Sequence, residues 1–181
     1  MLSGSEDYTL RLWDLPTGRL LRVLEGHQEK VCTLALSTDG TRAVSGAYDE
    51  TVIVWDLPAG RPLCTLRGHA SLLTDVAITP DGRVVVSAAM DRTVRVWDVA
   101  SGQARAVWDA HADVVETVAI CPDGRTLLSG GINDSHLRIW DLQTLEQSTA
   151  LEGPFNSIEK ITVGRQAASP CAPSTTPGAV P

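Results

Sequence analysis

Short apolar runs, separated by turn-forming residues, recur along most of the chain. In the best-preserved stretch they span residues 31–36, 42–45, 51–55 and 62–66. Several runs are apolar at adjacent positions, such as 52–54 and 84–86, where a strand with one buried face would alternate. Adjacent apolar positions are typical of strands that are covered on both faces. The pattern therefore predicts an all-β protein whose sheets are buried on both sides.

A tandem repeat of about 42 residues organises these runs. Four Trp-Asp pairs follow one another at steps of 42, 42 and 43 residues: Trp13-Asp14, Trp55-Asp56, Trp97-Asp98 and Trp140-Asp141. A Gly-His or Ala-His pair keeps the same spacing, and so do the Asp-Gly turns at residues 39, 81 and 123. The extra residue of the last step lies within 131–133, in a loop. Repeats of about 40–45 residues are typical of the four-stranded blades of β-propellers.

The combined Gly-His, turn and Trp-Asp pattern resembles the WD-repeat family over residues 1–163. The resemblance implies blades of four antiparallel strands arranged as part of a propeller. Trp108-Asp109 departs from the spacing, because it follows Trp97 by only 11 residues and aligns with Leu66 of the preceding unit. We expect Trp108 to be an apolar residue of an outer strand and not a further repeat marker.

Each full unit repeats one histidine, one serine, one aspartate and one tryptophan. The resemblance implies that these four side chains form a structural tetrad, in which the indole N–H donates to the serine, the serine hydroxyl reaches the histidine, and the histidine meets the aspartate. The donor and acceptor inventory permits such a chain with every buried group satisfied. The expected tetrads are His27, Ser45, Asp49 and Trp55; His69, Ser87, Asp91 and Trp97; and His111, Ser129, Asp134 and Trp140.

Serine, histidine and aspartate are also the members of a hydrolase triad. The set occurs three times and always with a tryptophan, and no Gly-x-Ser-x-Gly elbow surrounds any of the serines. We therefore expect no catalytic residues. Asp39, Asp81 and Asp123 are expected to form turns, and no metal site or cofactor is expected.

The repeat divides the chain into a propeller segment, residues 1–163, and a tail rich in Pro, Ser, Thr and Ala, residues 164–181, that we expect to be disordered. Within the segment we expect a partial blade over 1–25, three fuller repeats over 26–153, and an extra inner strand over 154–163. Propellers close with about four to eight blades, and this chain supplies about four. We expect an incomplete ring that belongs to a larger propeller; completion by association and a closed four-bladed ring are the alternatives.

Composition and charge narrow the class of partner. The formal net charge is −7 and lysines occur at only two positions, so the sequence shows no basic patch for nucleic acid. No apolar run approaches the roughly 18 residues of a membrane span, and no signal peptide is evident, so we expect no membrane insertion. The four cysteines are far apart, which is typical of unpaired thiols in a reducing compartment. We expect the cytoplasm, with the nucleus also open.

These observations predict a non-catalytic scaffold or adaptor that binds other proteins or peptides. The alternative is a regulatory or sensing propeller of a larger enzyme or ATPase whose catalytic domain lies outside this sequence. Self-association is expected if the ring is open. The loops that carry the tetrad histidines and aspartates are expected to form a partner-binding surface, here called the loop rim, unless these side chains only cover the blade ends. Its members are Tyr48, Met90, Ile132, Glu29, Lys30, Glu50, Arg92 and Asp113.

Overall fold

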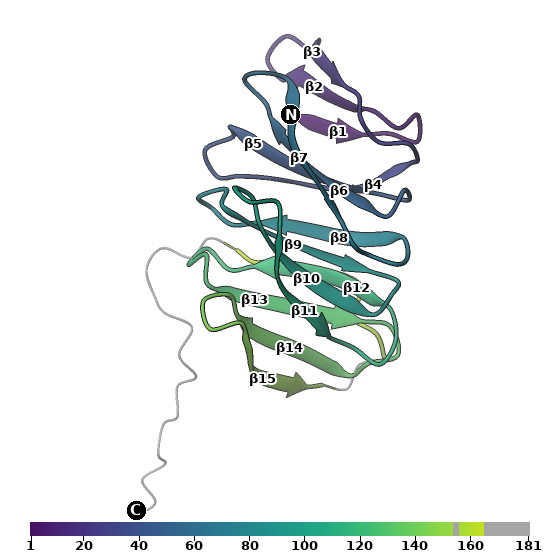
Figure 1. The fold of residues 1–181 in the computed structure, drawn as a ribbon, viewed down its shortest axis with the longest axis vertical. Helices are drawn as coiled ribbons and strands as arrows, with labels where there is room; N and C mark the ends of the chain where they lie inside the picture. The colour runs from purple at the N-terminus through teal and green to yellow at the C-terminus, as the bar shows by residue number, and fades with distance from the viewer. Residues whose placement is uncertain (154–155, 165–181) are drawn as a thin grey trace, which may run out of the picture.

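The computed structural model describes residues 1–153 and 156–164, and over these residues the chain is all-β (Figure 1). No helix occurs in this part of the chain, and hence none that could cross a membrane. The strands are β1 (Leu2–Gly4), β2 (Leu10–Asp14), β3 (Arg19–Leu24), β4 (Val31–Leu36), β5 (Arg42–Ala47), β6 (Thr51–Asp56), β7 (Arg61–Arg67), β8 (Leu73–Ile78), β9 (Val84–Ala89), β10 (Thr93–Asp98), β11 (Ala104–Asp109), β12 (Val115–Ile120), β13 (Thr126–Gly131), β14 (His136–Asp141) and β15 (Glu146–Glu152).

The strands form four antiparallel sheets, which are the expected blades. Blade 1 is three-stranded (β1–β3), and blades 2 (β4–β7), 3 (β8–β11) and 4 (β12–β15) are four-stranded. Within each blade the strands are neighbours in the order of the sequence, so each is a simple meander. The pairing register shifts just before the tryptophan in every blade, for example between Val54 and Trp55. Such a bulge re-aims the side chain that follows it.

Tight turns join the inner strand of each full blade to the second strand. In blade 2, Gly40 has a φ of 68°, in the left-handed region that glycine adopts without a steric cost. Asp39 holds the turn, because its carboxylate accepts hydrogen bonds from the Thr41 amide and the Ser37 hydroxyl. The repeated Asp-Gly dipeptides are therefore turn formers, as the sequence predicts.

The core consists of three apolar clusters, each lying between two consecutive blades. Along β6, Ile53 and Trp55 pack toward blade 1, whereas Val52 and Val54 pack toward blade 3. All four side chains are at most 2% exposed. This two-sided burial is the reason why adjacent positions in the central strands are apolar.

A buried carboxylate links the inner strands of blades 2, 3 and 4. Asp75 on β8 is only 7% exposed and accepts hydrogen bonds from Thr33 Oγ1 on β4 at 2.9 Å and from Thr117 Oγ1 on β12 at 3.0 Å. The Val118 amide donates to the same carboxylate at 3.1 Å. Residues 33, 75 and 117 are one repeat apart, so the three side chains come from the same position on the inner strand of each blade. Charge-assisted hydrogen bonds of this kind supplement the apolar contacts between blades.

The four blades form an open arc and do not close into a ring (Figure 1). The expectation of an incomplete ring is confirmed, and the alternative of a closed four-bladed ring is wrong. In Figure 1, blades 1 and 4 lie at opposite ends of the stack. A blade that is apolar on both faces therefore has one face without a neighbouring blade at each end of the described arc.

The extra inner strand predicted over 154–163 does not form in the described part of that segment. Residues 156–164 have no strand assignment. The segment nevertheless lies against blade 4, since the Ile158 amide donates to Gly131 O at 3.1 Å. The inner strand of blade 2 contacts the blade before it in the same way, because the Val31 amide of β4 donates to Ser5 O of blade 1. An inner strand needs a second strand of its own blade to complete the ladder, and none of the described residues provides one. The tail expected over 164–181 lies outside the described residues except for Gly164.

Candidate functional site

The tetrad of blade 2 is a continuous chain of hydrogen bonds. Trp55 Nε1 donates to Ser45 Oγ at 2.8 Å, and His27 Nε2 lies 2.8 Å from the same oxygen. His27 Nδ1 lies 3.0 Å from Asp49 Oδ2. An ionised carboxylate can only accept, so Nδ1 carries the proton and Nε2 accepts from the serine hydroxyl. Hydrogen bonds therefore link the indole to the serine, the serine to the imidazole, and the imidazole to the carboxylate. Each of these buried polar groups has a hydrogen-bond partner.

Blades 3 and 4 bring their four expected side chains together in the same way. The Trp–Ser, Ser–His and His–Asp distances are 2.8, 2.8 and 2.8 Å in blade 3 and 2.9, 2.9 and 2.7 Å in blade 4. In blade 1, Trp13 Nε1 donates to Ser3 Oγ at 2.9 Å, but Asp7 pairs with Arg11 instead of a histidine. The three full repeats thus share one geometry that ties the loop before the inner strand to the second and third strands.

A threonine that sequence reasoning overlooked completes the tetrad of blade 2. The Thr51 amide and hydroxyl both donate to Asp49 Oδ1, at 3.0 and 2.6 Å, while the Gln28 amide donates to Asp49 Oδ2. Thr93 has the same relation to Asp91. The signal was present in the sequence as a threonine two residues after the aspartate. The carboxylate therefore joins the histidine loop to the start of the third strand.

Burial and hydrogen bonding set the charge state of each tetrad. Burial lowers the pKa of His27, His69 and His111 below the ordinary value of 6.5, and the adjacent carboxylates only partly oppose this effect. For Asp49, burial alone would raise the pKa, but hydrogen bonds from Thr51, the Gln28 amide and His27 outweigh it and the pKa is lowered. At neutral pH the tetrads therefore pair neutral histidines with ionised aspartates.

The tetrad serines are not arranged as nucleophiles. Ser45, Ser87 and Ser129 are fully buried. Each oxygen accepts from an indole while its hydroxyl is directed at the histidine, so none of them faces a surface that a substrate could reach. The arrangement stabilises the blade and lacks the exposed oxygen that a hydrolase triad requires.

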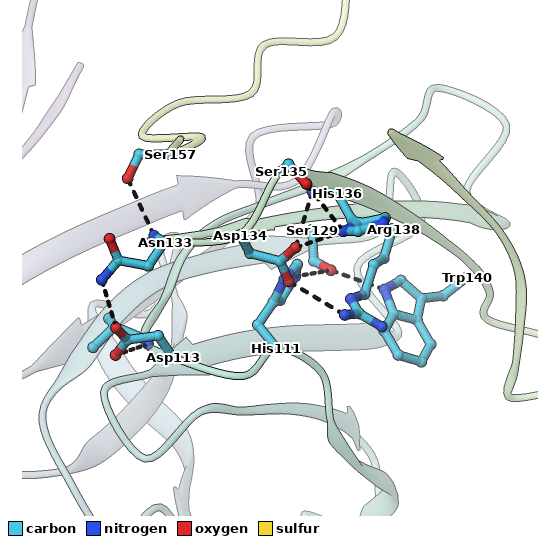
Figure 2. A network of polar contacts seen from close by, with 11 residues as sticks. His111, Asp113, Ser129, Asn133, Asp134, Ser135, His136, Arg138, Trp140 and Ser157 are labelled. Carbon is cyan, nitrogen blue, oxygen red and sulfur yellow. Dashed lines mark hydrogen bonds and ion pairs between the residues drawn. The ribbon is translucent and has the colours of Figure 1, made fainter. Parts of the chain in front are cut away.

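Blade 4 departs from the shared pattern, as Figure 2 shows. His136 stands where the other full blades have threonine, and its Nδ1 lies 2.9 Å from Asp134 Oδ1. Arg138 Nη2 donates to Asp134 Oδ2 at 3.2 Å, beside the contact from His111. Burial alone would raise the pKa of Asp134, but these hydrogen bonds lower it strongly. One carboxylate thus holds two histidines and an arginine.

The extra residue of the last repeat is also located in Figure 2. The Ile132 amide donates to Val114 O, just as the Tyr48 amide donates to Lys30 O and the Met90 amide to Leu72 O. Ile132 is therefore the structural counterpart of Tyr48 and Met90, and Asn133 is the insertion. Asn133 has a φ of 52° and donates through Nδ2 to Asp113 Oδ2 at 2.8 Å.

The residues assigned to the loop rim lie at one end of the blades, on the loops that carry the tetrad histidines and aspartates. Tyr48 is 41% exposed and Met90 is 44% exposed, whereas Ile132 is half-buried. Lys30 Nζ pairs with Glu6 Oε1 at 3.0 Å. The remaining charged members are exposed or, for Asp113, half-buried: Glu29, Glu50, Arg92 and Asp113.

The chain belongs to the WD40 family. The family described as WD domain, G-beta repeat matches the sequence three times, over residues 18–56, 60–98 and 102–141, which together make up most of the chain. Each match begins just before the outer strand of one blade and ends with the third strand of the next, so every sequence repeat links two blades. Repeats of this family are generally protein-interaction scaffolds, and their propeller domains are typically non-catalytic.

Trp108 lies within the third match and not at the start of a repeat of its own. It is on β11, the outer strand of blade 3, as expected. Its ring stacks on Trp140 of blade 4, with ring centroids 4.5 Å apart and an interplanar angle of 8°. Trp108 therefore packs between two blades.

We predict that Trp55→Phe destabilises the chain by about 1–3 kcal/mol, because it retains most of the apolar bulk but removes the donor to the buried Ser45 oxygen. Urea unfolding monitored by circular dichroism measures this loss. Trp13→Phe is the matched control, since Trp13 is half-buried and its serine is not joined to a histidine. Equal, near-zero effects of the two substitutions would contradict a stabilising tetrad.

We also predict that the free energy of unfolding decreases as the pH falls below 6.5. The three tetrad histidines have lowered pKa values in the folded chain, so below 6.5 the unfolded state binds more protons than the folded state. The contribution of these histidines to the free energy of unfolding is complete above pH 6.5. It is lost as the pH falls toward the lowered pKa values that they have in the folded chain. Urea unfolding at pH 7.5, 6.5 and 5.5 tests this. His111→Asn, with one buried histidine fewer, should be less stable but show a shallower pH dependence; an unchanged slope would refute the assignment.

Proposed function

We propose that this chain is a non-catalytic adaptor that binds proteins or peptides through the loop rim. The observation that carries the proposal is the exposure of Tyr48 and Met90, two large side chains, on neighbouring loops of blades 2 and 3. Aromatic residues and methionine are enriched at the centres of protein interfaces, and methionine adapts its shape to a partner. Their exposure supports a binding role over one limited to covering the blade ends.

The surroundings of these two side chains support the same proposal. Charged rim residues of both signs lie on the same and adjoining loops, and a margin of this kind helps to exclude water from an apolar contact when a partner binds. The supporting loops are held by backbone hydrogen bonds, from Tyr48 to Lys30 and from Met90 to Leu72, and by the tetrads beneath them. A surface that is already ordered loses little conformational entropy on binding.

We extend the proposal to the class of partner, the cellular compartment and the larger propeller to which these blades belong. The acidic composition supports protein partners over nucleic acid, and thiols that are far apart in the sequence support a reducing compartment, the cytoplasm or the nucleus. The open arc supports a place for these blades in a larger propeller, in which further blades would cover the two end faces.

We predict that the double variant Tyr48→Ala/Met90→Ala loses bound partners by roughly tenfold or more, because each truncation removes an interface side chain worth more than about 1 kcal/mol. Affinity purification from cell extract with quantitative mass spectrometry measures this loss. The matched control is Leu21→Ala/Leu63→Ala, which removes two exposed leucines from outer strands. Both variants should unfold at the wild-type urea midpoint within error. An identical partner list for the rim variant and the wild type would place the binding surface elsewhere.

We also propose that the chain self-associates through the uncovered face of blade 1. Trp13 is the counterpart of the fully buried Trp55 but is only half-buried, and Val23 lies on the neighbouring strand of the same blade. Light scattering should therefore give a mass above 19.3 kDa that falls in Val23→Glu. Val107→Glu, on β11 of an internal blade, should leave the mass unchanged. A monomeric wild type at all concentrations would exclude this mode of association.

A further inference from the structure

An arginine fills the junction between blades 2 and 3 at the end opposite the loop rim. Arg42, the first residue of β5, reaches across to the β8–β9 turn of blade 3, where its Nη1 donates to Gly82 O at 2.5 Å. Its aliphatic part covers Gly82, since a Cβ added there would lie 3.0 Å from Arg42 Cδ. The side chain is half-buried in this position. The junction is therefore built to hold a guanidinium group on a flexible stem.

The next junction has a related framework without the arginine, in which Pro80 lies beside the glycine instead, with its Cδ 3.3 Å from a Cβ added at Gly124. One repeat further along, Val84 takes the place of Arg42 and Gly124 takes the place of Gly82, with φ values of 71° at Gly82 and 68° at Gly124. Valine is too short to reach across the junction. A cavity of about 220 Å³ lies there, lined by Val84 and by residues of the two adjacent turns. The space is bounded by blades 3 and 4 together.

The lining of this cavity suits a cation on an aliphatic stem. Pro80 and Pro122 supply apolar walls, and Asp81 and Asp123 supply a carboxylate from each turn. The Thr79 hydroxyl lowers the pKa of Asp81; burial alone would raise the pKa of Asp123, but hydrogen bonds from the Thr126 and Arg125 amides lower it. Both carboxylates are therefore ionised at neutral pH.

The Asp81 carboxylate keeps capacity for a further donor. The Asp81 carboxylate accepts from the Thr79 hydroxyl and the Arg83 amide, both at Oδ1. Arg83 Nε lies 3.9 Å from Asp81 Oδ2, but its side chain is 81% exposed, and such surface pairs contribute little and exchange readily. A carboxylate offers about four acceptor positions, so a bound guanidinium can be accommodated beside the existing contacts.

We propose that the cavity between blades 3 and 4 binds an arginine side chain of a partner polypeptide, in the manner in which Arg42 occupies the preceding junction. The cavity is formed by the turns between first and second strands, whereas the loop rim includes the loops between second and third strands, so the two surfaces lie at opposite ends of the blades. The site is therefore independent of the loop rim and can be tested separately from it.

The test is a titration of the full ¹⁵N-labelled chain with N-acetyl-arginine methylamide, followed by ¹H–¹⁵N correlation spectra. The uncharged isostere N-acetyl-citrulline methylamide is the ligand control. The arginine amide should shift the Gly124 and Val84 resonances with an apparent Kd on the order of 1 mM, typical of one side chain, and leave Gly40, in the β4–β5 turn of blade 2, unmoved. Equal shifts with citrulline would overturn the proposal, because they would show that the charge is not recognised.

Two reciprocal variants make the assignment specific. Val84→Arg should fill the cavity from within and abolish the shifts at Gly124. Arg42→Val should open the preceding junction and add a second set of shifts at Gly40. Asp81→Asn, an exposed and isosteric change, should weaken the arginine affinity about fivefold with the fold intact. Unchanged binding in Val84→Arg, or in Asp81→Asn if the first variant fails to fold, would refute the site.

Discussion

The hydroxyl group of the tetrad serine is the point on which the geometry of each full blade depends. It lies on the second strand, accepts from an indole on the third strand, and donates to a histidine on the loop before the first strand. A fully buried oxygen can be tolerated only if its hydrogen bonds are made, so the three elements must meet at one place. The loops that carry the histidine and the aspartate are thereby fixed, and with them the position of the loop rim.

Two-sided burial is the second constraint, and it acts between blades instead of within them. A central strand such as β6 packs one set of side chains toward blade 1 and the alternate set toward blade 3. Each blade thus needs two neighbours, and the carboxylate of Asp75 adds hydrogen bonds along the inner strands of three blades. Because the arc is open, the end faces do not meet this requirement within the described residues, which is the physical basis for the proposed association.

The candidate binding sites lie at positions where one repeat differs from the others. The tetrads are nearly identical, so they position surfaces without distinguishing partners. Under the proposed binding modes, differences at single register positions distinguish them: Tyr48 and Met90 on the rim, the inserted Asn133, and Val84 in place of Arg42 at the opposite end. In a repeat protein the shared residues maintain the scaffold, and the varied residues determine what it binds.

The sequence alone determined the repeated four-stranded blades, because turn-forming and apolar residue types recur every 42 or 43 residues, and its resemblance to the WD-repeat family implied the membership of the tetrads. It did not determine the contacts between blades. The bridge of Asp75, the reach of Arg42 to Gly82, the identity of Ile132 as the counterpart of Tyr48, and the lack of a strand over 156–164 appear only in the tertiary structure. Each depends on which residues of different repeats lie side by side, and that is set by how whole sheets stack, not by the local pattern of any one strand.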